Sequence, residues 1–85
     1  MSKSREKVID KILAGNADAN IKFSDLCKVL QQFEFHLRTK GSHHIFYKEG
    51  IEEIINIQPT KDNKAKPYQV KQVRQLIIKY KLKSK

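Results

Sequence analysis

The spacing of apolar residues changes twice along this 85-residue chain, and these changes restrict the folds that it can adopt. Over residues 4–13 and 24–33, apolar side chains recur every three to four positions, which predicts two helices. Over residues 35–58, apolar and polar side chains alternate instead, which predicts strands. Helical spacing returns over residues 67–82. A chain of this length forms one small domain, so the pattern predicts an α+β fold in the order helix, helix, strands, helix.

Turn residues divide the alternating stretch into three short strands. Gly41-Ser42 separates a strand over residues 35–38 from a strand over residues 43–48. Glu49-Gly50 precedes a third strand over residues 53–58. Three short antiparallel strands cannot close a barrel, so the helices must cover one face of the sheet. The other face stays open, and on a basic domain such a face suits RNA or a protein partner.

The predicted helices carry signals for their ends and faces. Ser24 is expected to cap the helix over residues 24–33, because its hydroxyl can accept a hydrogen bond from a first-turn N–H group. In the last helix, Lys71 and Arg74 lie off the apolar stripe and are predicted to face water. That stripe consists of Val70, Val73, Ile77 and Tyr80, with Leu76 beside it.

Basic residues are concentrated at the C-terminal end of the chain. The chain has 18 Lys and Arg against 9 Asp and Glu, a formal net charge of +9. Residues 61–85 carry nine of the basic residues and one acid, Asp62. A concentrated positive field attracts polyanions, and nucleic acid is the commonest such partner. The alternative is a solvated helix face with a lysine-rich tail. An anionic membrane is disfavoured, because the stretch lacks an opposite face rich in Trp, Phe or Leu.

Composition excludes several classes of site. The single cysteine, Cys27, rules out a disulfide framework and a cysteine-based zinc site, and it is predicted to be a small buried hydrophobic residue. The three glycines lie too far apart to form a phosphate-binding loop. No apolar run approaches the roughly 18 residues of a membrane-spanning helix, and residues 1–20 lack the apolar segment of a secretory signal. We expect a soluble, cytoplasmic protein without a membrane partner.

Two adjacent histidines follow the Gly41-Ser42 turn. Consecutive strand residues point to opposite faces, so His43 and His44 cannot chelate one metal ion together, and no metal site is predicted. One of them shares a face with Phe46, and the other shares a face with Tyr47. A histidine near cations can remove the proton of an RNA 2′-OH, since its pKa lies near neutrality, and such cleavage needs no metal. From the pattern alone, a purely structural or surface role for the pair is the favoured alternative.

The residues around this turn resemble a known family. The segment Lys40-Gly41-Ser42-His43-His44-Ile45-Phe46 is similar to the signature of the HicA toxins of type II toxin–antitoxin systems. The resemblance continues through residues 58–75, from the end of the third strand to the start of the last helix. In all it covers roughly residues 22–82.

This resemblance implies a fold, an activity and a partner. The fold would be similar to that of double-stranded-RNA-binding domains, which recognise the shape and backbone of RNA with little reading of its sequence. The activity would be that of an endoribonuclease that cleaves mRNA without a metal or small-molecule cofactor. A HicB-type antitoxin would cover its site. In the family motif Gly-Ser-x-His the last residue is catalytic, which assigns His44, with His43 as second choice.

The other candidate residues follow from charge and backbone freedom. We expect His44 to act as general base or acid on the 2′-OH and the leaving oxygen. Gly41 allows the turn to approach a phosphate closely, and the N–H or hydroxyl group of Ser42 can bind that phosphate. The candidates for further RNA contacts are Lys40, Lys64, Lys66, Lys71 and Arg74.

The chain departs from the family pattern in two places. Residues 1–20 form a helical extension that short members lack, so we divide the chain into this extension and a HicA-like domain over residues 21–85. No histidine follows the third strand, so the general acid is expected to be a Lys, a Tyr such as Tyr47, or water. His36 is expected to be structural or exposed.

Two alternatives to the ribonuclease remain open from the sequence. One is a non-catalytic RNA-binding module of the same fold. The other is a protein-interaction or ribosome-associated domain that its basic tail tethers.

Overall fold

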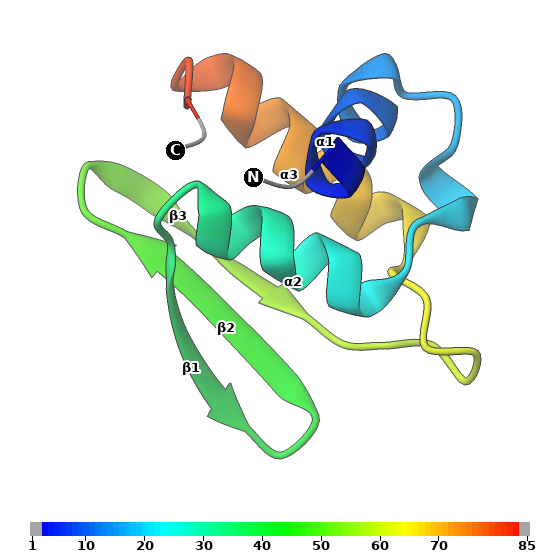
Figure 1. Cartoon of the computed structure of the whole chain (residues 1–85). Coiled ribbons are helices and arrows are strands. Elements are labelled where there is room, and N and C mark those ends of the chain that lie inside the picture. The colour runs from blue at the N-terminus through cyan, green and yellow to red at the C-terminus, as the bar shows by residue number, and fades with distance from the viewer. Residues whose placement is uncertain (1–2, 84–85) are drawn as a thin grey trace.

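The elements of the protein follow the predicted order. The computed structural model describes residues 3–83, with side chains from residue 8 onward. It is an α+β fold, in which a short 3₁₀ helix at Asp18–Asn20 joins the first two helices (Figure 1). The other elements are α1 (Lys3–Ala14), α2 (Phe23–Gln32), β1 (His36–Lys40), β2 (His43–Lys48), β3 (Ile51–Ile57) and α3 (Pro67–Lys79).

The three strands form one antiparallel sheet in the order β1-β2-β3. Leu37 pairs with Phe46 across β1 and β2, and Phe46 pairs with Ile55 across β2 and β3. Directly paired residues point to the same face, so these three side chains mark the face that the helices cover. Figure 1 shows α2 lying across the sheet, with α1 and α3 packed above it. The predicted one-sided cover is confirmed.

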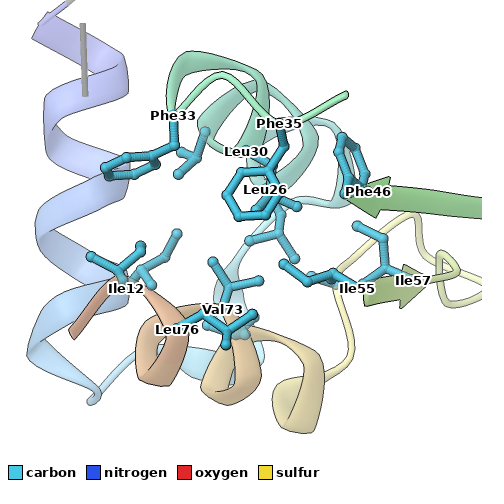
Figure 2. Close-up of a cluster of buried hydrophobic side chains, with 14 of the residues drawn as sticks. Ile12, Leu26, Leu30, Phe33, Phe35, Phe46, Ile55, Ile57, Val73 and Leu76 are labelled. Carbon is cyan, nitrogen blue, oxygen red and sulfur yellow. The ribbon is translucent and has the colours of Figure 1, made fainter. Parts of the chain in front are cut away.

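The core lies between the sheet and the helices. The predicted stripe of the last helix is confirmed: its Val and Leu members and Ile77 are buried, and Tyr80 is half-buried. Cys27 is half-buried and packs against the same core. Figure 2 shows Phe46, Ile55 and Ile57 of the sheet directed toward Leu26 and Leu30 of α2 and Val73 of α3, all of them buried.

Several element boundaries differ from the predicted ones by one to three residues, and two of these differences have a clear structural cause. The predicted cap by Ser24 is wrong, because α2 begins at Phe23 with Lys22 as N-cap and no side chain caps it. Backbone pairing with a later loop explains this earlier start, since the N–H of Phe23 donates to the carbonyl of Asn63 (3.0 Å). The third strand begins at Ile51, two residues early, because Ile51 pairs directly with Lys48 across the turn.

Helix α1 belongs to the same core as the rest of the domain. Ile12 is 0% exposed and joins the buried cluster. The guanidinium of Arg74 donates to the backbone carbonyl of Ile12 (3.0 Å) and to both carboxylate oxygens of Asp18 (2.9 and 3.2 Å). The prediction that Arg74 faces water is therefore wrong: this side chain ties α3 to the end of α1 and to the 3₁₀ helix.

We expect Arg74→Met to lower the free energy of unfolding by about 1.5–3 kcal/mol, the usual contribution of a hydrogen bond to a charged group. The variant keeps a side chain of similar length and leaves Asp18 without its cation. Urea denaturation followed by circular dichroism measures the loss. Adding Asp18→Asn to the same protein should recover part of it. An unchanged midpoint together with weaker RNA binding would instead make Arg74 the RNA contact that its charge predicts.

A second group of side-chain hydrogen bonds joins β3 to the end of α3. The carboxylate of Glu53 accepts hydrogen bonds from Lys79 Nζ (2.8 Å) and from the hydroxyl of Tyr80 (2.6 Å). The bond from Lys79, and then that from Tyr80, lowers the pKa of Glu53 from 4.5 to about 2. Glu53 therefore stays ionised through the neutral range, and it holds α3 against the covered face of the sheet.

Candidate active site

His44 is the second residue of β2, directly after the β1–β2 turn. The chain reverses at Gly41, whose φ of +60° suits glycine, and the β2 strand then begins at His43 as predicted. His44 pairs with Ile57 of β3, so its side chain points to the face that the helices cover. The side chain is half-buried at the edge of the helical layer, where it meets the start of α2.

Two contacts orient the imidazole of His44. Its Nδ1 lies 3.3 Å from the carbonyl oxygen of Ser42, and because a carbonyl only accepts, Nδ1 carries the proton. The ring of Phe23, at the start of α2, meets the imidazole edge to face, with centroids 4.9 Å apart and planes at 79°. In the neutral imidazole, Nε2 therefore holds the lone pair, which is the arrangement that a general base requires.

Ser42 is itself tied to the end of the sheet. Its hydroxyl accepts a hydrogen bond from Nε2 of Gln58, which follows β3 (3.1 Å). The turn that supplies the carbonyl for His44 is thus attached to two strands. This bond occupies the Ser42 hydroxyl as an acceptor but leaves its proton available to a phosphate.

His43 points to the opposite, open face, as predicted from strand alternation. Its Nδ1 donates to Oδ1 of Asn56 on β3 (3.0 Å), and the side chain is exposed. Tyr47 lies on the same open face, because it is four residues, an even number, further along β2. A role for Tyr47 as general acid beside His44 is therefore contradicted, since the sheet separates the two side chains. His36 is exposed, as expected, and its ring lies against that of Tyr47.

The loop between β3 and α3 brings lysines to the end of the molecule that holds His44. This loop pairs with the start of α2 through the bridge Lys22–Lys64 and the bond from Ala65 N–H to Ile21 O (2.8 Å). Lys64 is exposed, and Lys66 is the N-cap of α3. Figure 1 shows this loop beside the start of α2, with the β1–β2 turn below them and the β2–β3 turn at the far end of the sheet.

The other residues predicted to contact RNA lie on different parts of the fold. Lys40 pairs with His43 and stands on the open face. Lys71 is exposed on α3. Arg74 points away to α1 and Asp18, so the structure does not bring it to the site. Two residues that the sequence did not point to contact the site, namely Phe23 and Gln58, and their contacts depend on tertiary packing that no local pattern records.

Two other chemistries find no support in side-chain placement. Among the described side chains, those of residues 8–83, no group of three or more His, Cys, Asp or Glu is arranged to hold a metal ion. Burial raises the pKa of the Cys27 thiol from 9.0 to about 11, so this cysteine is protonated at neutral pH and is a poor nucleophile.

Within residues 3–83, no helix is both long and apolar enough to cross a membrane.

Comparison with protein families decides the family. The model of the HicA toxin of bacterial toxin–antitoxin systems matches residues 23–80, which is more than half of the chain. The chain belongs to the HicA toxin family. HicA toxins are mRNA interferases, and membership of a toxin–antitoxin family implies an antitoxin partner. Searches of curated proteins and of solved structures find no match. The HicA match begins at Phe23, so it includes the ring that contacts His44 and leaves out α1.

Proposed function

We propose that this HicA family member is a cytoplasmic, metal-independent endoribonuclease in which His44 is the general base. The observation that carries the proposal is the orientation of His44: Nδ1 is bonded to the Ser42 carbonyl, and Phe23 supports the ring. This leaves Nε2 as the basic nitrogen, at an end of the molecule where lysines gather. The arrangement suits a substrate that carries both a hydroxyl nucleophile and a phosphate, as RNA does.

The proposed reaction is an internal transesterification. Nε2 of His44 takes the proton of a 2′-OH, and the 2′-oxygen forms a bond to the adjacent phosphorus. The bond from phosphorus to the 5′-oxygen breaks, and that oxygen takes a proton from water or from a lysine at the site. The products are a 2′,3′-cyclic phosphate on one fragment and a 5′-OH on the other. No oxidant, metal or cofactor enters this balance.

Cations at the site support the proposal electrostatically. Lys64 pairs with Lys22, the N-cap of α2, and Lys66 is the N-cap of α3, so the positive end of a helix dipole adds to the field beside each of them. Such groups stabilise the extra negative charge that develops on the phosphorane during the attack. The backbone N–H of Ser42 and the space beside Gly41 add a place for a phosphate oxygen. Lys40 and Lys71 are proposed to contact the RNA backbone further out.

The proposed partner is a HicB-type antitoxin that covers His44. The Gly41-Ser42 turn beside His44 is exposed, so a protein surface can reach and shield the site directly. We expect co-expression of this antitoxin to relieve any growth arrest that the toxin causes.

The test is the product chemistry of the purified protein on mRNA. We expect cleavage that persists in EDTA and that leaves 2′,3′-cyclic phosphate ends, detected because phosphatase does not remove them until acid opens the ring. Induced expression should arrest growth and deplete mRNA. RNA that binds but stays intact would favour the non-catalytic RNA-binding module, and loss of cleavage in EDTA would contradict the metal-independent mechanism.

A further inference from the structure

The face of the sheet that the helices leave open has its own pattern of side chains. By the strand register, β1 and β2 direct six side chains to it: His36, Arg38, Lys40, His43, Ile45 and Tyr47. Five of the six are exposed, and Ile45 is half-buried. This face is distinct from the side that holds His44.

The open face offers a ring surface at the end away from the Gly41 turn. The rings of His36 and Tyr47, which pair across β1 and β2, lie with centroids 5.3 Å apart and planes at 33°. Tyr47 is 43% exposed, and Ile54 of β3, on the same face, is 60% exposed. Exposed aromatic rings on an open sheet are platforms on which unpaired RNA bases stack.

Two cations of β1 lie between these rings and the Gly41 turn. Arg38 and Lys40 stand at alternate positions of β1, about 6.6–6.8 Å apart along the strand. Both are exposed, and neither forms an ion pair with any residue that the structure describes. Their charge complements a phosphate backbone. At the end of the face away from the turn, Glu34 and Glu49 line a shallow depression together with His36 and one cation, Lys48, so acidic side chains outnumber the lysine there.

We propose that this open face binds single-stranded RNA. Bases stack on the His36–Tyr47 ring pair, and the backbone follows Arg38 and Lys40 to the Gly41 turn, beyond which lies His44. The proposal rests on the proposed ribonuclease for its choice of substrate, and it names single-stranded RNA rather than a duplex as that substrate. A duplex keeps its bases stacked inside, so it cannot use the ring pair.

The test measures RNA affinity in the His44→Ala protein, in which the RNA stays intact. The probe is a short fluorescein-labelled RNA without self-complementarity, followed by anisotropy over a range of salt concentrations. We expect Tyr47→Ala to raise Kd by at least about fivefold, the lower end of the loss per stacked base, and Tyr47→Phe to leave it unchanged. Tyr47→Thr removes the ring while favouring a strand, so it should repeat the loss if Tyr47→Ala unfolds.

Charge is tested separately with a matched pair. Arg38→Ala should reduce the slope of log K against log salt by about 0.7, the value of one phosphate contact to a single strand. Lys11→Ala, an exposed cation on α1 away from the sheet, should leave the slope unchanged. The same probe annealed to its complement should bind with no dependence on Tyr47.

Three results would overturn the proposal. The first is a folded Tyr47→Thr protein that binds the single strand as tightly as its parent. The second is an equal loss of affinity for single strand and duplex. The third is weakened binding of the antitoxin with unchanged RNA affinity, which would make this face a protein interface. Because binding is measured without cleavage, an inactive wild-type protein whose RNA affinity still depends on Tyr47 would contradict the ribonuclease and leave this surface standing.

Discussion

His44→Ala is expected to slow RNA cleavage by about 10²–10⁴-fold, the usual contribution of a general acid or base. The variant removes the Nε2 lone pair and leaves the lysines and the turn in place. RNA affinity should stay nearly unchanged, because one neutral imidazole adds little to binding that phosphate contacts dominate. The measurement is the first-order cleavage rate at saturating RNA, together with Kd for an uncleavable 2′-deoxy analogue.

His43→Ala is the matched control for this prediction. The two histidines are neighbours on β2, but the sheet places them on opposite faces, and Asn56 rather than Ser42 orients His43. The control should therefore keep the cleavage rate at saturating RNA. If His43→Ala abolished cleavage and His44→Ala did not, the catalytic assignment would move to the second choice. A fall in affinity as large as the fall in rate would make His44 a binding residue instead.

The local parts of the site were predictable from sequence because local rules govern them. Glycine at position 41 marks the turn, and strand alternation places His43 and His44 on opposite faces whatever the rest of the fold does. The bounds of β2 followed from the same pattern and are confirmed. The resemblance to HicA toxins then selected His44, which the spacing alone could not do.

The long-range contacts were out of reach for equally physical reasons. Phe23 meets His44 from 21 positions earlier in the chain, and Gln58 reaches Ser42 from 16 positions later, so no periodicity connects either pair. Arg74 shows the limit of a helical stripe. Its position off the apolar face predicted that Arg74 is exposed to solvent. Instead, the C-terminal end of α1 and Asp18 pack against this side of α3 and pair with the guanidinium.

The N-terminal extension illustrates how a family match and a folding unit can differ. The match begins at residue 23, whereas Ile12 of α1 lies in the common core and its carbonyl accepts a hydrogen bond from α3. Burial of this kind means that α1 contributes to the stability of the part that carries the site. The division into residues 1–20 and 21–85 therefore remains a proposal about function. It does not describe the packing, in which both parts share one core.

A pair of neighbouring isoleucines provides the second large prediction, which concerns the register of the sheet. Ile55 is 0% exposed and pairs with Phe46 on the covered face, whereas Ile54 is 60% exposed on the open face. Ile55→Ala should lower the free energy of unfolding by about 2–5 kcal/mol through lost burial and a cavity. Ile54→Ala, the same chemical change one position away, should alter it by only about 0.5 kcal/mol. Urea denaturation followed by circular dichroism measures both.

The loss at Ile55 is large for this chain, because a domain of its length has a total stability of roughly 4–13 kcal/mol. Ile55→Val, expected to cost about 0.5–1.5 kcal/mol, gives a variant that stays folded and is compared with Ile54→Val. A larger effect at Ile54 than at Ile55 would mean that β3 is shifted by one residue. Such a slip moves every side chain of a strand to the other face. It would break the pairing of Ile57 with His44, so the same stability measurement tests the placement on which the catalytic assignment depends.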